Sequence, residues 1–192
     1  MTSNRHTDDV VLDAVRACVL AVGVRRTTLT DVARRAGVSR MTLYRRYPDV
    51  DALVRDLMTR EFGAVLQNAG EQGRDGAGVR ERVVATAVAT VAELRGNELF
   101  RRVMDVDPEL LLPYVTDRLG STQWTTLELL TDGIHSGQQA GQVRTGDPRT
   151  IAYGALLLIQ PFVYSTRLVA DVLDDEQLNI ELARILDRYL AP

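Results

Sequence analysis

The sequence has few of the residues that build a disulfide framework or a metal centre. Its 192 residues include a single cysteine, Cys18, and two isolated histidines, His6 and His135. One cysteine excludes an intramolecular disulfide and a multi-cysteine zinc site. No apolar run reaches the ~18 residues that cross a membrane, and the polar first nine residues contain no signal-peptide core. We therefore expect a cytoplasmic protein that uses no membrane, metal or cofactor.

Catalytic motifs are also missing. The sequence contains no G-x-S-x-G nucleophile elbow, no P-loop and no glycine pattern of a dinucleotide-binding fold. His135 lacks an H-x-x-x-H or H-x-x-E partner, and the acid pair Asp174-Asp175 is typical of a helix start. The sequence therefore predicts a protein that is not an enzyme.

Charge is unevenly distributed along the chain. All 23 basic residues are arginine, lysine is absent, and 26 acidic residues give a net charge of −3. Residues 1–62 hold 11 arginines and 8 acids, whereas residues 63–192 hold 12 arginines and 18 acids. From Arg25 to Arg46 there are seven arginines and one acid, Asp31. This cluster predicts a polyanionic partner, and a solvated charged face is the alternative interpretation.

Apolar residues recur at three- and four-residue intervals along most of the chain, which is the pattern of amphipathic helices. No segment of any length alternates as a strand does. We therefore predict an all-α fold of about nine or ten helices. Residues 68–78 hold four glycines and no large apolar residue, and are predicted to form a loop. The predicted helices span residues 8–23, 28–36, 40–47, 49–67, 79–95, 98–106, 108–119, 121–140, 149–172 and 175–190.

Residues 28–53, TLTDVARRAGVSRMTLYRRYPDVDAL, predict two short helices on either side of Gly37. A tight turn between helices that cross near a right angle needs a residue that tolerates positive φ, and glycine does. Val32, Val38 and Leu43 supply a small shared core. The outer side of the second helix carries groups that hydrogen-bond phosphates and base edges. This arrangement predicts a helix-turn-helix with residues 40–47 in the major groove of DNA. The outer residues are Arg40, Thr42, Tyr44, Arg45 and Arg46.

At these residues the chain resembles the TetR family of transcriptional repressors. The resemblance implies a three-helix DNA-binding head, residues 1–48, and a larger helical domain, residues 49–192. It also implies that the larger domain binds a small effector and forms a homodimer through its last two helices. Effector binding would then lower the affinity for a palindromic operator on double-stranded DNA. The matching positions are Thr28, Val32-Ala33, Ala36-Gly37-Val38-Ser39, Thr42-Leu43-Tyr44 and Tyr47.

The resemblance assigns roles to single residues of the head. Phosphates would be held by Thr28, Ser39 and Tyr44, through hydroxyls and the N–H groups at helix ends. The groove would be faced by Thr30, Arg40, Met41, Thr42 and Arg45, with Arg46 beside them on the DNA-binding surface.

Two positions depart from the family pattern. Many relatives carry a lysine at the start of the fourth helix, in a proline-serine-lysine turn, where this chain has Asp49-Val50. The phosphate contact of that lysine is therefore missing. Many relatives also have a glycine where Met41 stands. The apolar side chain of Met41 suits a thymine methyl group and would shift the sequence preference.

The larger domain is less informative. An apolar pocket between its helices would suit a lipophilic effector. Residues 151–163 are apolar nearly all round, which predicts a helix buried on more than one side and kinked at Pro161. The candidate pocket residues are Phe100, Met104, Leu111, Tyr114, Trp124, Leu127 and Tyr164. The candidate dimer residues are Leu158, Phe162, Leu178, Leu182, Ile185 and Tyr189. For both sets, the ordinary core of a single chain is the alternative interpretation.

Two functional interpretations follow from these features. The first is a dimeric DNA-binding regulator, a repressor with an activator as the alternative, whose recognition helices lie about 34–36 Å apart, one turn of DNA. The second is a helical interaction protein whose DNA-binding head has lost its affinity for an operator.

Overall fold

The structure is a computed structural model that describes residues 2–73 and 78–192, with side chains from residue 8 onward. All regular elements in these ranges are helices, so the predicted all-α class is confirmed. The chain packs into two units. We call Met1–Phe62 with Asn97–Arg118 the head unit, and Gly63–Gly96 with Leu119–Pro192 the C-terminal unit. The functional boundary expected after residue 48 stays a prediction.

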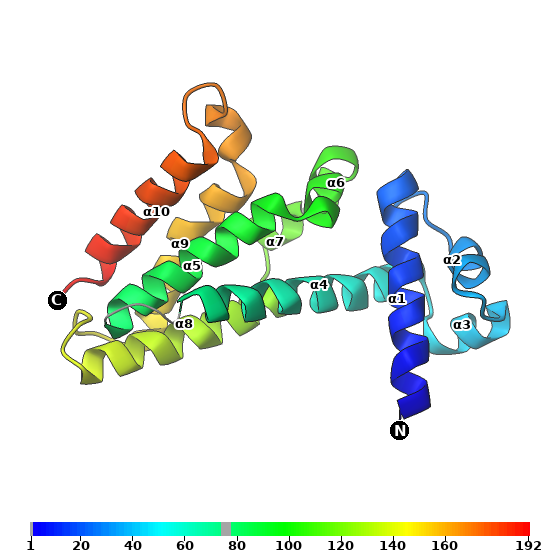
Figure 1. The fold of residues 1–192 in the computed structure, drawn as a ribbon, viewed down its shortest axis with the longest axis horizontal. Helices are drawn as coiled ribbons and strands as arrows, with labels where there is room; N and C mark the ends of the chain where they lie inside the picture. Colours follow the sequence, from blue (N-terminus) through cyan, green and yellow to red (C-terminus); the bar gives the residue numbers. More distant parts are fainter. Residues whose placement is uncertain (1, 74–77) are drawn as a thin grey trace. The chain divides into compact units, whose positions relative to one another are not determined.

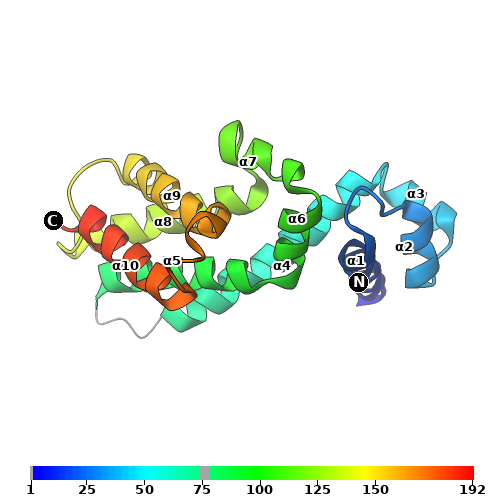
Figure 2. The same cartoon turned by 90° about the horizontal axis from the view of Figure 1, so that it is seen from above.

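The head unit is a small helical cluster built around α1. Helices α2 and α6 pack directly against α1, and α3 packs against α2 (Figures 1 and 2). Their apolar faces form one core, in which Val15, Leu53 and Leu99 are fully buried. Burying a side chain of this size stabilises the fold by about 1.5–3 kcal/mol. The elements are α1 (Thr2–Val22), α2 (Leu29–Ala36), α3 (Arg40–Arg46), α4 (Val50–Gln72) as far as Phe62, α6 (Glu98–Val106), η2 (Pro108–Leu110) and α7 (Leu112–Thr116).

The C-terminal unit is a bundle in which α5, α8, α9 and α10 pack against one another. Ile134 and Leu182 lie fully buried at its centre. Asp147 and Asp174 begin the last two long helices by accepting backbone N–H hydrogen bonds of 2.8 Å from the first turn. No helix among the described residues is both long and apolar enough to cross a membrane. The elements are α5 (Val79–Gly96), α8 (Ser121–Gln139), α9 (Pro148–Tyr164), η3 (Thr166–Val169) and α10 (Asp175–Leu190).

Several predicted boundaries are wrong. The helix predicted over residues 108–119 is divided into η2 and α7, because Pro113 has no N–H with which to continue the helical hydrogen bonds. The helix predicted over residues 149–172 ends at Tyr164, shortly after Pro161, and η3 follows it.

The ends of α1 and α4 also differ from the prediction. The first helix begins at Thr2 rather than at residue 8. α4 continues to Gln72, although the sequence predicts a loop from residue 68. Gly70 costs the helix roughly 1 kcal/mol, and complete burial of the neighbouring Ala69 offsets this cost. Residues 74–77 of the predicted loop lie outside the described residues.

Candidate nucleic-acid interface

The first helix of the helix-turn-helix begins at a threonine cap. The hydroxyl of Thr28 accepts a hydrogen bond from the backbone N–H of Asp31 at 3.1 Å and donates to the Asp31 carboxylate at 2.6 Å. Leu29 and Val32 face the core, and Thr30 is half-buried on the other side of α2. The predicted start of this helix is therefore confirmed.

The turn between α2 and α3 depends on Gly37. Its φ is +68°, in the left-handed region that glycine adopts without strain. The N–H of Gly37 donates to the carbonyl of Arg34 at 3.4 Å, and that of Val38 to the carbonyl of Ala33 at 3.0 Å, which together form a Schellman motif. No atom lies within 4 Å of a Cβ built at residue 37. Backbone conformation, and not lack of space, therefore requires glycine here.

The second helix, α3, is capped by Ser39. The Ser39 hydroxyl accepts from the N–H of Thr42 at 3.0 Å and lies 2.7 Å from the Thr42 hydroxyl. Leu43 and Tyr47 fix the inner side of the helix, since they are 2% and 5% exposed. Burial raises the pKa of the Tyr47 phenol above its ordinary value. All other residues from Ser39 to Arg46 are solvent-exposed: Ser39, Arg40, Met41, Thr42, Tyr44, Arg45 and Arg46.

The exposed face of α3 presents cations that no carboxylate neutralises. Among the described residues, neither Arg40 nor Arg45 has an ion pair or a hydrogen bond to another side chain. Arg46 differs, because its guanidinium pairs with Asp8 and lies 5.5 Å from the ring centre of Tyr47. The structure therefore leaves the predicted DNA-binding residues from Ser39 to Arg46 exposed to solvent, with Arg46 less available than the other two arginines.

Two further arginines of the cluster share these properties. Arg26 and Arg35 are exposed and have no ion pair among the described residues, whereas Arg25 and Arg34 are paired with acids. The sequence analysis gave neither residue a role of its own, although both belong to the basic cluster from Arg25 to Arg46.

Asp49 and Val50 stand at the start of α4, where many relatives carry a lysine. Asp49 accepts a hydrogen bond from the N–H of Ala52 at 2.7 Å and so caps the helix. Val50 is half-buried against the head core. These two residues serve local folding, and neither supplies a cation for a phosphate.

The predicted pocket residues are divided between the two units. Phe100, at 5% exposure, makes an edge contact with Phe62 with ring centres 6.2 Å apart. Trp124 is 42% exposed, with Arg149 5.9 Å from its ring centre. Burial raises the pKa of Tyr164. The head unit holds Phe100, Met104, Leu111 and Tyr114, and the C-terminal unit holds Trp124, Leu127 and Tyr164. Their role in effector binding stays a prediction.

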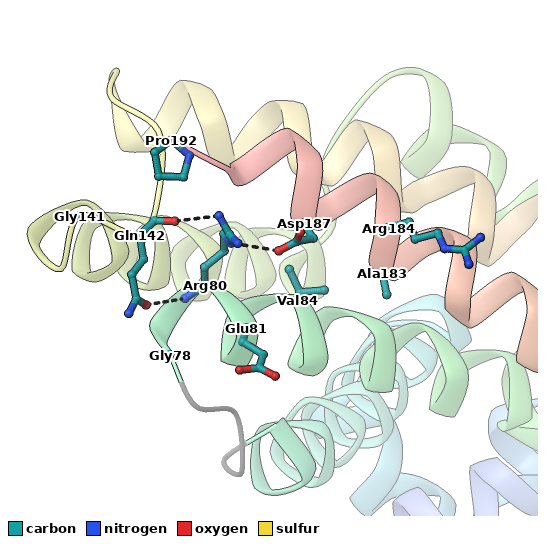
Figure 3. Close-up of a pocket in the computed structure, with 10 residues that line it drawn as sticks. All are labelled: Gly78, Arg80, Glu81, Val84, Gly141, Gln142, Ala183, Arg184, Asp187 and Pro192. Carbon is teal, nitrogen blue, oxygen red and sulfur yellow. Dashed lines mark hydrogen bonds and ion pairs between the residues drawn. The ribbon is translucent and has the colours of Figure 1, made fainter.

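The structure shows a cavity elsewhere, within the C-terminal unit (Figure 3). It measures about 710 Å³ and lies between the start of α5, the turn after α8 and the last turns of α10. Three of its polar side chains already have partners. Arg80 pairs with Asp187 at 2.9 Å, and the Gln142 amide oxygen accepts from the backbone N–H of Val79 at 2.6 Å. None of the predicted pocket residues lines this cavity.

The predicted dimer residues are mostly packed inside their own unit. Leu157 on α9, one residue from a predicted position, is 67% exposed, and Tyr153 is 37% exposed. Sequence reasoning missed both, because an all-apolar helix gives no sign of which side faces outward. Of the predicted set, Leu178 and Leu182 are buried, Leu158, Phe162 and Tyr189 are half-buried against the core, and Ile185 is exposed.

Comparison with known proteins identifies related sequences. A family model described as bacterial regulatory proteins, tetR family, matches residues 11–57. An uncharacterized HTH-type transcriptional regulator of Mycobacterium bovis is 39% identical over 191 residues, which cover 99% of this chain and 98% of that protein. A regulator of the same description from Mycobacterium tuberculosis has the same identity and coverage.

Solved structures show the same fold at lower identity. The complex of SmeT with triclosan has a TM-score of 0.68 and 18% identity, covering 97% of this chain and 92% of its own. The Rhodococcus erythropolis repressor QsdR, from the TetR family, has a TM-score of 0.69 and 17% identity, covering 97% and 95%.

Proposed function

Because the chain belongs to the tetR family of bacterial regulatory proteins and is an HTH-type transcriptional regulator, we propose that it is a repressor that releases a palindromic operator when a small effector binds. The protein acts in the cytoplasm, where it meets double-stranded DNA. The effector is lipophilic and binds between the helices of the larger domain, residues 49–192. Repression follows from occupancy of the operator, and release follows when the effector prefers a conformation with lower operator affinity.

The observation that carries the DNA-binding part of this proposal is the exposed side of α3. Among the described residues no carboxylate pairs with Arg40 or Arg45, while Leu43 on the opposite side packs the helix against the head core. Free guanidinium groups are suited to phosphates and to the O6 and N7 atoms of guanine. The hydroxyls of Thr28, Ser39 and Tyr44 supply phosphate contacts beside them, and Thr30 and Thr42 face the groove.

Dimerisation is supported by apolar side chains that face outward from the C-terminal unit. Leu157 on α9 and Ile185 on α10 are 67% and 37% exposed, and each is surrounded in sequence by residues that form the core. A second copy of the chain covers these two side chains. The half-buried dimer candidates Leu158, Phe162 and Tyr189 pack against the core of the same unit. The two-fold axis of such a dimer matches the symmetry of a palindromic operator.

The effector part is supported by similarity and by composition. SmeT, which shares the fold, was solved with triclosan. The candidate pocket residues are mainly apolar or aromatic, as in most small-molecule sites, and Tyr114, Trp124 and Tyr164 add polar groups that can orient a ligand.

Binding of the purified protein to the DNA that flanks its own gene tests the proposal. A labelled duplex is titrated at several salt concentrations, with and without excess unrelated DNA. We expect saturable binding that survives the competitor and weakens as salt rises, because phosphate contacts release counterions. Weak binding that the competitor abolishes at every site tried would support the alternative, an interaction protein with a degenerate head.

The dimer is tested separately by a matched pair of variants. Leu157→Asp places a charge on the outward side of α9, and Leu129→Asp does the same at a 53% exposed leucine on α8. We expect sedimentation to show monomers only for Leu157→Asp. A dimeric Leu157→Asp protein would exclude this side of α9 from the interface.

A further inference from the structure

We propose that Asp107 is a positioning residue for DNA binding, whose buried carboxylate fixes the turn from which the helix-turn-helix starts. This inference rests on the proposed function, because its main readout is operator affinity. It assigns α6 and the turn after it to the DNA-binding machinery, although they lie far along the chain from the recognition helix.

The turn between α1 and α2 receives a hydrogen bond from Asp107. Val24 is 4% exposed, and its backbone N–H donates to Oδ2 of Asp107 at 2.7 Å. Within the turn, the Thr27 hydroxyl donates to the carbonyl of Gly23 at 2.8 Å. A buried N–H must have an acceptor, and here the acceptor comes from a residue 83 positions later in the sequence.

Asp107 is itself held rigidly at the end of α6. It is 2% exposed, its N–H donates to the carbonyl of Val103 at 2.9 Å, and its carbonyl accepts from the N–H of Leu110 at 3.0 Å. Val103 and Leu99 on the same helix belong to the core that also contains Leu43 of α3. The carboxylate is therefore fixed relative to the core of the head unit.

Further contacts join α6 to α1 along its length. Arg16 pairs with Glu98 at 3.2 Å, near the start of α6, and the Arg102 guanidinium donates to the carbonyl of Ala21 at 3.3 Å. After α6, Glu109 pairs with Arg25 of the turn at 2.6 Å. These contacts lie at both ends of α6, so the position of Asp107 relative to α1 does not depend on a single contact.

The close approach at the turn requires glycine. A Cβ at residue 23 would lie 2.7 Å from Oδ2 of Asp107 and 2.8 Å from a methyl carbon of Val106. The φ of Gly23 is +84°, which also favours glycine. Both the close approach of the carboxylate and the positive φ therefore require glycine at residue 23.

The consequence for DNA binding follows from where the turn leads. Thr28, the last residue before α2, caps that helix, and α2 packs against the recognition helix α3. Without the Asp107 hydrogen bond, the turn and the start of α2 sample further conformations. The apparent dissociation constant then rises in inverse proportion to the fraction of heads in the competent conformation.

Three full-length variants test the proposal by operator titration and hydrogen exchange. Asp107→Ala removes the acceptor, Asp107→Asn keeps a carbonyl oxygen in its place, and Asp117→Ala removes an exposed carboxylate from the same segment. We expect Asp107→Ala to weaken operator binding by roughly tenfold or more, the scale of a lost buried hydrogen bond. Asp107→Asn and Asp117→Ala should bind like the parent protein. The Val24 amide should exchange slowly in the parent and in Asp107→Asn, and fast in Asp107→Ala, while the Leu43 amide stays protected.

The outcomes separate this inference from the proposed function. If the parent binds an operator and Asp107→Ala binds equally well, Asp107 is not a positioning residue. If the parent binds no operator, the proposed function fails, and the exchange rate at Val24 still tests the hydrogen bond. If Asp107→Ala does not fold, fast exchange at Val24 in the parent protein, or weak binding by Asp107→Asn with an intact fold, would overturn the inference.

Discussion

Gly154 on α9 lies directly against the hydroxyl of Tyr189 on α10, and a Cβ at residue 154 would overlap that hydroxyl. The Tyr189 hydroxyl donates to the carbonyl of Ile151 at 3.2 Å, and the Arg144 guanidinium lies 4.6 Å from the ring centre on another side. The ring is therefore held in place from two directions. Close packing of the last two long helices depends on the missing side chain at residue 154.

This contact predicts opposite effects for two glycine-to-alanine substitutions within helices. Gly154→Ala should lower the free energy of unfolding by about 1–3 kcal/mol, because the tyrosine must move. At Gly63 in α4 no atom lies within 4 Å of a new Cβ. Gly63→Ala should therefore raise the free energy of unfolding by up to about 1 kcal/mol, because alanine has the higher helix propensity. Denaturant titration of both variants measures the difference. If both substitutions stabilised the protein equally, the Tyr189 side chain would move aside without lowering the free energy of unfolding.

The head could be predicted from the sequence because its signals are local. Thr28, Gly37 and Ser39 each act on residues within a few positions, as a cap or as a left-handed turn, and the structure shows each in that role. The same holds for the starts of α9 and α10. The exposed side of α3 follows from helical periodicity once Leu43 is assigned to the core.

Long-range packing could not be predicted in this way. In the sequence, Asp107 before Pro108 is typical of a helix start, and nothing local indicates that its carboxylate binds the N–H of Val24. On α9, residues 151–163 are apolar on every side, so periodicity could not distinguish the exposed Leu157 from the half-buried Leu158. Both failures concern contacts between segments that are distant in the chain.

Removing the two free arginines of α3 should weaken operator binding in distinguishable ways. A guanidinium that reads a guanine contributes about 1–3 kcal/mol, and its loss relaxes the preference for that base. A guanidinium on a phosphate lowers affinity for all sequences, and its loss reduces the salt slope by about one. Arg40→Ala and Arg45→Ala are each titrated against the operator and point-mutated operators over a range of salt.

Arg188→Ala is the matched control for these variants, since Arg188 is exposed on α10 and has no ion pair among the described residues. It makes the same change in net charge outside the head. If it weakened binding as much as Arg40→Ala and Arg45→Ala, the effect would come from overall charge and not from α3.

Cys18 should make stability fall at alkaline pH. The thiol is 8% exposed in α1, and burial raises its pKa above the ordinary 9.0, against the smaller opposing effect of Arg35. A raised pKa in the folded state favours the protonated thiol. Its contribution is therefore complete below pH 9.0 and is lost as the pH rises through the folded-state pKa.

The free energy of unfolding of the parent protein, minus that of Cys18→Ala, measures this contribution between pH 7 and pH 10. We expect the difference to decrease above about pH 9. Buried Tyr47 and Tyr164 titrate in both proteins and cancel. A difference that stays constant, or rapid labelling of the folded thiol at pH 8, would show that Cys18 is accessible to solvent.

Met41 is expected to read a thymine methyl group. It is 77% exposed on α3, the most exposed large apolar side chain among the described residues of the head unit, between arginines that attract DNA. A solvated methionine on a cationic face gains nothing from folding, but contact with the C5 methyl of thymine would bury apolar surface on both partners. Replacing thymine by uracil in the operator removes that methyl group and leaves the base pairing unchanged.

We expect a thymine-to-uracil replacement in one half-site to weaken binding of the parent protein by about fourfold, because burying a methylene-sized group contributes ~0.8 kcal/mol. Met41→Ala should bind the two operators equally, since its side chain is too short to reach the methyl group. Uracil outside the bound sequence controls for changes in the duplex itself. Equal affinity of the parent protein for every uracil-containing operator would exclude a methyl contact, and an equal loss in Met41→Ala would assign the contact to another side chain of the exposed face.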